Sequence, residues 1–177
     1  PVAIMVGTGK AAEYGILIKS AESLENLHHM DTVVLDKTGT LTSGHPAVTD
    51  IQVLEPGLTQ EGFLAAAAAV ERGSEHPLAQ AVVEAAQVAG IAPPAAERFE
   101  AVAGRGVRAL IAGREYLAGN LAFLAANGLG AGEARAAAER LAAEGKTPLL
   151  FARDGRLLGT IAVADTLRAD SLQAVER

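Results

Sequence analysis

The sequence predicts an α/β protein in which a block of helices and antiparallel strands is inserted after one strand of a parallel sheet. Three observations support this prediction. An apolar run at 32–35 ends in an acid, alanine-rich segments of helical character follow, and Asp154-Gly155 separates two apolar runs near the C-terminus. A continuous apolar run is typical of a parallel strand buried on both faces. Asp-Gly between apolar runs predicts a two-residue turn, which joins antiparallel strands.

The first part of the chain supplies the expected parallel-sheet elements. Residues 2–13 have mixed helical character, 15–19 are expected to form a short strand, and 20–29 a helical stretch. The apolar run then predicts a buried strand at 32–36. Glycines and prolines between 44 and 57 indicate a passage from one domain into another.

The middle of the chain is expected to combine helices with an antiparallel sheet. Helices are predicted at 59–72 and 77–89, because Gly73 separates them and Pro77 suits the first turn of a helix. The further predicted elements are strands at 98–103 and 105–112, helices at 120–126 and 133–143, a hairpin of 149–153 with 157–164, and a last helix after Asp165-Thr166-Leu167-Arg168.

Composition excludes several classes of function. The chain has 177 residues and a net charge of −6, which argues against a nucleic-acid partner. It contains no cysteine, so disulfides and thiolate metal sites are excluded within this sequence. No apolar run approaches the ~20 residues that span a bilayer. The chain starts at Pro1 and ends within a helical pattern, so we expect a fragment of a longer protein.

The heptad from Asp36 to Thr42, Asp-Lys-Thr-Gly-Thr-Leu-Thr, is the most specific chemical motif. Asp36 follows the predicted strand, at the end where α/β sheets bind ligands. The small hydroxylated residues after it, with Gly39 free to adopt unusual backbone angles, can surround a phosphoryl group. This arrangement suits Asp36 as a nucleophile that forms an aspartyl-phosphate. An Asp that caps a turn is the alternative, which suits an isolated Asp better than a whole heptad.

Four residues further along predict an adenine pocket. Glu71 and His76 lie at the end of one predicted helix and the start of the next, and Gly104 and Gly106 flank Arg105. A carboxylate that accepts from an amino group, an imidazole that stacks and a bare glycine surface suit a flat base. Taken singly, the histidine is also a candidate helix cap, and the glycines are candidates for a β-turn.

These motifs resemble a known family. The heptad resembles the phosphorylation motif of P-type ATPases, and Ser-Glu-His-Pro with the Gly-x-Gly resembles the nucleotide-binding domain of their heavy-metal (type IB) branch. The resemblance implies that Glu71, His76, Gly104 and Gly106 bind the adenine of ATP. Asn120, which follows a glycine, matches a further family position near that pocket.

The resemblance also implies a division into domains. Residues 1–45 and 165–177 would belong to an incomplete doubly wound, haloacid dehalogenase-like phosphorylation domain. Residues 46–164 would form an inserted α+β nucleotide-binding domain built on an antiparallel sheet. The match extends over nearly the whole chain, because Asp165-Thr166-Leu167-Arg168 resembles the family's return into the phosphorylation domain.

The implied catalytic residues are Asp36, Lys37 and Thr38. Asp36 would attack the γ-phosphate of ATP, Lys37 would neutralise charge, and Mg²⁺ would be held by Asp36 and Thr38 with ligands from outside this chain. The family's later Thr-Gly-Asp and Gly-Asp-Gly-x-x-Asn-Asp motifs do not occur in the sequence. We therefore expect the chain to bind ATP without completing turnover alone.

The copper-exporting branch fits best, because Ile16-Leu17-Ile18-Lys19-Ser20-Ala21-Glu22 is typical of it. The expected protein is a copper(I) exporter of the plasma (inner) membrane, and this chain its cytosolic loop. Its expected partners are the membrane helices, the actuator domain, the rest of the phosphorylation domain and the transported metal ion. Zinc/cadmium exporters share most of the motifs and are the first alternative.

A soluble haloacid dehalogenase-type phosphatase is the second alternative. Such enzymes carry Asp-x-Asp, in which the second Asp acts as acid and base. Here Thr38 occupies that position, which favours a phosphoenzyme that persists over one that hydrolyses quickly. A third interpretation is a module that only binds nucleotide, which is compatible with the family resemblance.

Overall fold

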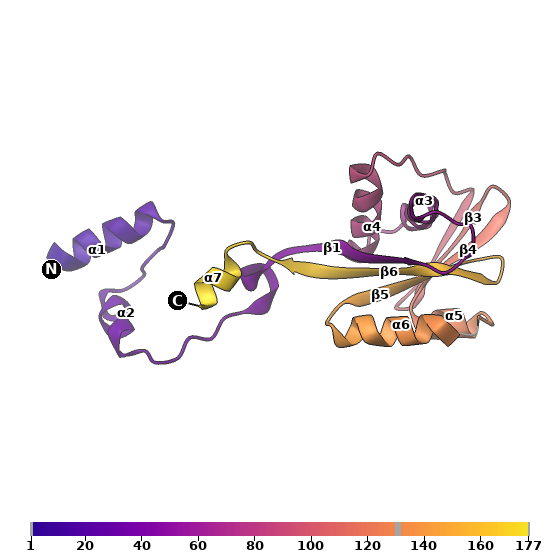
Figure 1. Ribbon diagram of the computed structural model, residues 1–177. Coiled ribbons are helices and arrows are strands. Elements are labelled where there is room, and N and C mark those ends of the chain that lie inside the picture. The colour runs from indigo at the N-terminus through magenta and orange to yellow at the C-terminus, as the bar shows by residue number, and fades with distance from the viewer. Residues whose placement is uncertain (1, 130–131, 177) are drawn as a thin grey trace. The chain divides into compact units, whose positions relative to one another are not determined.

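The computed structural model describes residues 2–129 and 132–176 and divides the chain into two units, residues 1–36 and 37–177. Figure 1 shows the helices of the first unit and the mixed α/β architecture of the second. The two units are described separately. None of the described helices has both the length and the apolar character that crossing a bilayer requires.

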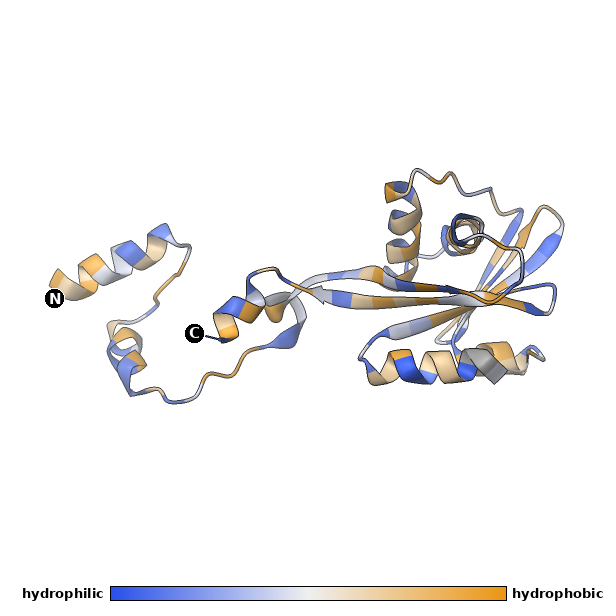
Figure 2. Cartoon of the chain, in the orientation of Figure 1, coloured by the Kyte–Doolittle hydropathy of each residue, from blue (hydrophilic) through white to orange (hydrophobic). Residues whose placement is uncertain are grey.

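The first unit consists of short helices joined by extended segments. It contains α1 (Val2–Glu13), α2 (Ala21–Asn26) and the single turn η1 (Leu27–His29), none of which buries a residue. Ser20 begins α2, because its hydroxyl accepts a hydrogen bond from the backbone N–H of Ser23 at 3.1 Å. Hydrophobic residues of α1 remain at its surface (Figure 2).

The strands predicted at 15–19 and 32–36 are absent, so this part of the prediction is wrong. Neither segment is part of a sheet, and Val33 and Val34 are 75% and 91% exposed. A strand needs a neighbour that accepts and donates its backbone hydrogen bonds. The described sheet contains no ladder with either segment, so sequence character alone does not produce the strand.

The second unit is built on a six-stranded antiparallel sheet in the order β1-β6-β5-β4-β3-β2. Short turns join β2 to β3, β3 to β4 and β5 to β6, whereas the edge strand β1 pairs with β6 from a distant part of the chain (Figure 1). The strands are β1 (Thr42–Val53), β2 (Arg98–Val102), β3 (Gly106–Ile111), β4 (Arg114–Gly119), β5 (Thr147–Arg153) and β6 (Arg156–Leu167).

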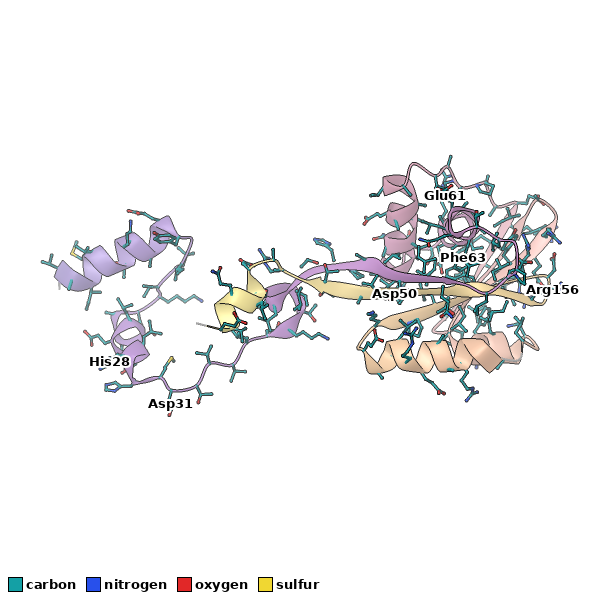
Figure 3. All side chains as sticks on the ribbon, viewed as in Figure 1. His28, Asp31, Asp50, Glu61, Phe63 and Arg156 are labelled. Carbon is teal, nitrogen blue, oxygen red and sulfur yellow. The ribbon has the colours of Figure 1, made fainter. Side chains whose placement is uncertain are left out.

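Two pairs of helices cover opposite faces of this sheet (Figure 1). One face carries α3 (Gln60–Glu71) and α4 (Pro77–Val88); the other carries α5 (Leu121–Ala126) and α6 (Gly132–Ala143). Phe63 of α3, labelled in Figure 3, meets Phe151 of β5 edge to face with ring centroids 5.7 Å apart, and both residues are buried. This contact anchors the larger core, while Leu124 and Leu150 belong to a smaller core under α5 and α6.

The predicted hairpin at Asp154-Gly155 is confirmed: both residues have positive φ, 48° and 74°, and they join β5 to β6. A second turn of the same kind, at Ala112-Gly113, joins β3 to β4. The sequence analysis did not predict β4, because Ala-Gly is a weaker turn signal than Asp-Gly.

Most of the segment 44–57, predicted as a passage between domains, lies in strand β1. Pro46 fits because β1 is an edge strand, where a missing N–H leaves no neighbour unpaired. The chain ends in a short helix, α7 (Ser171–Val175), beyond β6.

Candidate functional site

A cavity of about 400 Å³ lies in the second unit, where the α3–α4 turn, the β2–β3 turn, the start of α5 and the start of β5 meet. It collects all of the residues predicted to bind the nucleotide, although they are spread over 50 positions of sequence. These residues are Glu71, His76, Gly104, Gly106 and Asn120.

Glu71 is the last residue of α3, and its side chain is only 6% exposed. Its carboxyl forms no hydrogen bond or ion pair with any described residue, although it lines the cavity. Burial without a partner disfavours the charged form and raises the pKa of Glu71 to about 7. The site therefore presents a carboxyl group whose pKa lies far above that of an exposed glutamate.

His76 lines the cavity and also forms the helix cap that the sequence offered as the alternative. It is the N-cap of α4: its Nδ1 accepts a hydrogen bond from the backbone N–H of Leu78 at 3.2 Å, and Pro77 follows it in the first turn. Because Nδ1 accepts, the proton of the neutral ring lies on Nε2. The ring lines the cavity in an orientation fixed by the helix cap.

Gly104 and Gly106 differ in why their positions suit a glycine. Gly104 has φ of 69° in the β2–β3 turn, and a Cβ there would meet nothing within 4 Å. Gly106 faces Gly119 across β3 and β4, and a Cβ on it would lie 2.2 Å from the carbonyl oxygen of Ala118. The sheet itself requires Gly106, while Gly104 leaves open space at the cavity.

Asn120 links two walls of the cavity. Its Oδ1 accepts from the N–H of Phe123 at 2.9 Å, which caps α5, and its Nδ2 donates to the carbonyl of Gly104 at 3.4 Å. The side chain therefore holds the β2–β3 turn against the start of α5. Arg105, exposed between the two glycines, also lines the cavity, and the sequence analysis noted it without a role.

The predicted catalytic residues Asp36, Lys37 and Thr38 are exposed. Asp36 ends the first unit, whereas Lys37 and Thr38 begin the second. The turn Lys37–Leu41 is irregular, because Thr38 is extended and Gly39 has φ of 75°. Within the described part of the chain, no three His, Asp or Glu side chains gather as a metal site.

A hydrogen-bond network joins this loop to the start of β1 and the end of β6. The hydroxyl of Thr42 is buried, accepts from the N–H of Gly39 at 3.2 Å, and lies 3.1 Å from the carbonyl of Lys37. It also contacts the carboxylate of Asp165, which accepts from the N–H of Gly44 at 2.9 Å. The Thr42 hydroxyl is the main cause of a lowered pKa at Asp165.

The sequence analysis placed Thr42 and Asp165 in two separate motifs and missed their contact, which spans 123 positions. The backbone of the same loop is held a second time. The carbonyl of Leu41 accepts from the hydroxyl of the buried Ser171 at 2.7 Å and from the N–H of Arg168 at 3.0 Å. The loop after Asp36 is thus shaped by residues from the other end of the chain.

The family of haloacid dehalogenase-like hydrolases matches residues 30–177. Among curated proteins, a silver-exporting P-type ATPase of Salmonella typhimurium is 46% identical over the whole chain, and a copper-exporting P-type ATPase of Bacillus subtilis is 43% identical. The chain spans only 22% of the length of each of these two relatives.

The solved structures that resemble this chain are also P-type ATPases or their domains. A zinc-transporting PIB-type ATPase in its E2·Pi state superposes with a TM-score of 0.89 at 41% identity, over 98% of this chain and 28% of that one. The N-domain of the copper-transporting ATPase HMA8 superposes with a TM-score of 0.57 at 27% identity, over 67% of this chain and 99% of the domain. The catalytic domain of the CPx-ATPase CopB-B gives 0.66 at 25% identity, over 96% of this chain and 58% of that one, in a study of nucleotide binding.

Proposed function

Because the chain belongs to the haloacid dehalogenase-like hydrolase family, we propose that it is the ATP-binding and phosphorylation segment of a copper(I)-exporting P-type ATPase. The heavy-metal P-type resemblance predicted from the motifs is confirmed by the silver- and copper-exporting relatives. The observation that carries the proposal is the cavity, because it gathers every residue predicted for the nucleotide around one space of suitable size.

The cavity supports adenine as the occupant. Glu71 supplies a buried carboxyl for the polar edge of a base, and the ring of His76 supplies a flat surface held by its helix cap. Gly104 leaves the β2–β3 turn open to close approach, and Asn120 holds that turn in place. These features together favour a planar base over an extended or branched ligand.

In the proposed reaction, an oxygen of the Asp36 carboxylate attacks the γ-phosphorus of ATP. The bond from that phosphorus to the β–γ bridging oxygen breaks, and ADP leaves with the bond electrons. Lys37 offsets negative charge on the transferred group. Thr38 follows Lys37 in a turn whose backbone contacts the hydroxyl of Thr42.

The carboxylate of Asp36 and the carbonyl of Thr38 are oxygen donors of the kind that suits Mg²⁺, which would supply charge neutralisation at the phosphoryl group. The proposed transport partners are the transported metal ion and the remainder of the pump. The proposed location of this segment is the cytosolic side of a plasma (inner) membrane. A zinc substrate is the second candidate, because the zinc-transporting structure superposes closely.

Calorimetric titration of ATP tests the nucleotide site. We expect wild type to bind in the micromolar-to-millimolar range, and His76→Gln and Glu71→Ala each to weaken binding at least tenfold, which is about 1.4 kcal/mol. Matched controls are His45→Gln and Glu61→Ala, which change an exposed histidine on β1 and an exposed glutamate at the other end of α3. Binding by the two cavity variants that equals wild type would refute the site.

Copper transport needs its own test in the intact pump. We expect Asp36→Asn to abolish phosphoenzyme formation from radiolabelled ATP and copper-stimulated ATP hydrolysis together, because the carboxylate nucleophile is lost. A silver or zinc response in place of a copper response would correct the substrate and leave the mechanism standing. Phosphoenzyme formation by the asparagine variant would overturn the role of Asp36.

A further inference from the structure

Glu71 is the one charged residue among the buried residues of the described chain. It ends α3 and lines the cavity, and its carboxyl group forms no hydrogen bond or ion pair with the described residues around it. Two other ionisable residues line the same cavity: His76 from α4 and Arg105 from the β2–β3 turn. The parts of β2, β4 and β5 that line it contribute no titratable side chain. A buried polar group without a partner is costly unless a ligand completes its hydrogen bonds.

The protonation state of that group decides which ligand completes it. A carboxylate has only acceptor atoms, whereas a carboxylic acid offers one O–H donor beside one carbonyl acceptor. Adenine presents an amino donor next to a ring-nitrogen acceptor. The neutral acid matches both atoms of that edge, and the carboxylate matches only the amino group. Two adjacent N–H donors, as on the pairing edge of guanine, match the carboxylate instead.

We propose that Glu71 holds the base as a neutral carboxylic acid, donating to a ring nitrogen and accepting from the amino group, so that ATP binding takes up a proton. The inference rests on the proposed function, since ATP must occupy this cavity. It differs from the sequence-based expectation, in which Glu71 acts as a carboxylate acceptor. Burial supports it, because the pKa of Glu71 is already raised to about 7 before a base excludes further water.

Two consequences follow from this hydrogen-bond pattern. Above neutral pH the free site loses its proton and the complex must regain one, so ATP affinity should fall up to about tenfold for each pH unit. The preference for ATP over GTP should shrink over the same range, because the ionised form no longer provides the donor for adenine. Nucleotide selectivity is therefore coupled to pH through one side chain.

Calorimetry of ATP binding in buffers of different ionisation enthalpy counts the protons taken up. Between about pH 8 and pH 9 the phosphate groups of ATP, which titrate near ~6, stay ionised and do not contribute. We expect close to one proton taken up per ATP bound by the wild-type chain, and a smaller ratio of ATP to GTP affinity at the higher pH. Binding of ATP with no proton uptake would overturn the inference and leave the nucleotide site standing.

Two variants assign the proton to its residue. Glu71→Gln carries an amide with a permanent donor and acceptor, so we expect its ATP affinity to be independent of pH and to exceed that of wild type near pH 9. His76→Gln removes the other candidate proton carrier and should bind ATP more weakly with the uptake retained. Uptake that disappears in His76→Gln, or persists in Glu71→Gln, would place the proton elsewhere. Absence of any ATP binding by wild type would instead refute the proposed function itself.

Discussion

Two short apolar runs of similar sequence, one in each unit, adopt different structures. Val33-Val34-Leu35 lies in an extended segment of the first unit, and its side chains are 75%, 91% and 44% exposed. Ile161-Ala162-Val163 lies in β6 of the second unit and is fully buried. Both runs have the residues that strands prefer. Only the second has neighbours, β1 and β5, that pair with its backbone.

The difference teaches that an apolar run specifies a strand only together with its partners. Pairing of β6 on both edges and packing on both faces remove its backbone and side chains from water at once. In the first unit none of the helices buries a residue, so little offsets the entropy of ordering the chain. We therefore expect the second unit to hold most of the stability of this chain.

Hydrogen exchange should reveal the largest effect. We expect the amides of β5 and β6 to exchange at least about a thousandfold more slowly than those of residues 32–36, because opening the sheet requires nearly the full ~5 kcal/mol of a small domain. Native-state exchange followed by mass spectrometry measures both regions in one experiment. Protection of 32–36 equal to or greater than that of 149–164 would contradict the comparison.

Glycine substitutions give a matched pair across the two units. In Gly119→Ala the new Cβ would lie 2.4 Å from the carbonyl of Arg105 in the close crossing of β3 and β4, so we expect a loss of about 3 kcal/mol. In Gly9→Ala the new Cβ meets nothing within 4 Å, and the helix α1 gains up to about 1 kcal/mol. Urea unfolding of the sheet measures the first change, and the helical signal of α1 measures the second. A Gly119→Ala protein as stable as wild type would show that the crossing can relax.

Much of the second unit was predictable from sequence because its elements carry local signals. The helix caps at Thr59, His76 and Asn120 and the turn at Asp154-Gly155 fix elements without knowledge of distant contacts. The predicted fold class is confirmed, with an antiparallel sheet inside a haloacid dehalogenase-like match. The strand β1 was not predicted, because only its pairing with β6 turns a Gly- and Pro-containing segment into a strand.

The candidate site divides in the same way. The chemistry of the side chains was enough to select Glu71, His76 and Gly104 from the sequence, and the fold brings them to one cavity. Burial of Glu71 and its missing partner depend on how α3 packs, so sequence could not indicate its altered protonation. The contact of Thr42 with Asp165 also required the fold, because the start of β1 and the end of β6 lie side by side only when the two strands pair.

The free energy of unfolding should depend on pH through Glu71. Its pKa is about 7 when folded and about 4.5 when unfolded, so below about pH 4.5 the acid form is present in both states. As pH rises from about 4.5 to 7, the carboxyl ionises in the unfolded state before it does so in the folded state. The free energy of unfolding therefore falls by up to about 3 kcal/mol over this range. We expect Glu71→Gln to lose this slope and to be the more stable protein near pH 8 in the absence of nucleotide.

Urea midpoints of wild type and Glu71→Gln at about pH 5 and pH 8 measure this effect. Glu61→Gln is the control, because it removes an exposed carboxyl from the first turn of the same helix. We expect the control to follow the pH dependence of wild type. Parallel curves for wild type and Glu71→Gln would show that water reaches the Glu71 carboxyl in the folded protein.

Thr160 offers the smallest test of the same contrast. It lies in β6 at 1% exposure, and its hydroxyl has no hydrogen-bond partner among the described residues. Valine has nearly the same shape without the hydroxyl, so Thr160→Val should stabilise the sheet by up to about 1 kcal/mol.

Thr32→Val is the matched change in the first unit, where the hydroxyl is exposed and donates to Asp31 at 3.0 Å. We expect thermal unfolding to show a gain for the first variant and no change for the second, because only the buried hydroxyl has lost its water. A loss of stability in Thr160→Val would mean that its hydroxyl makes a favourable interaction within the sheet.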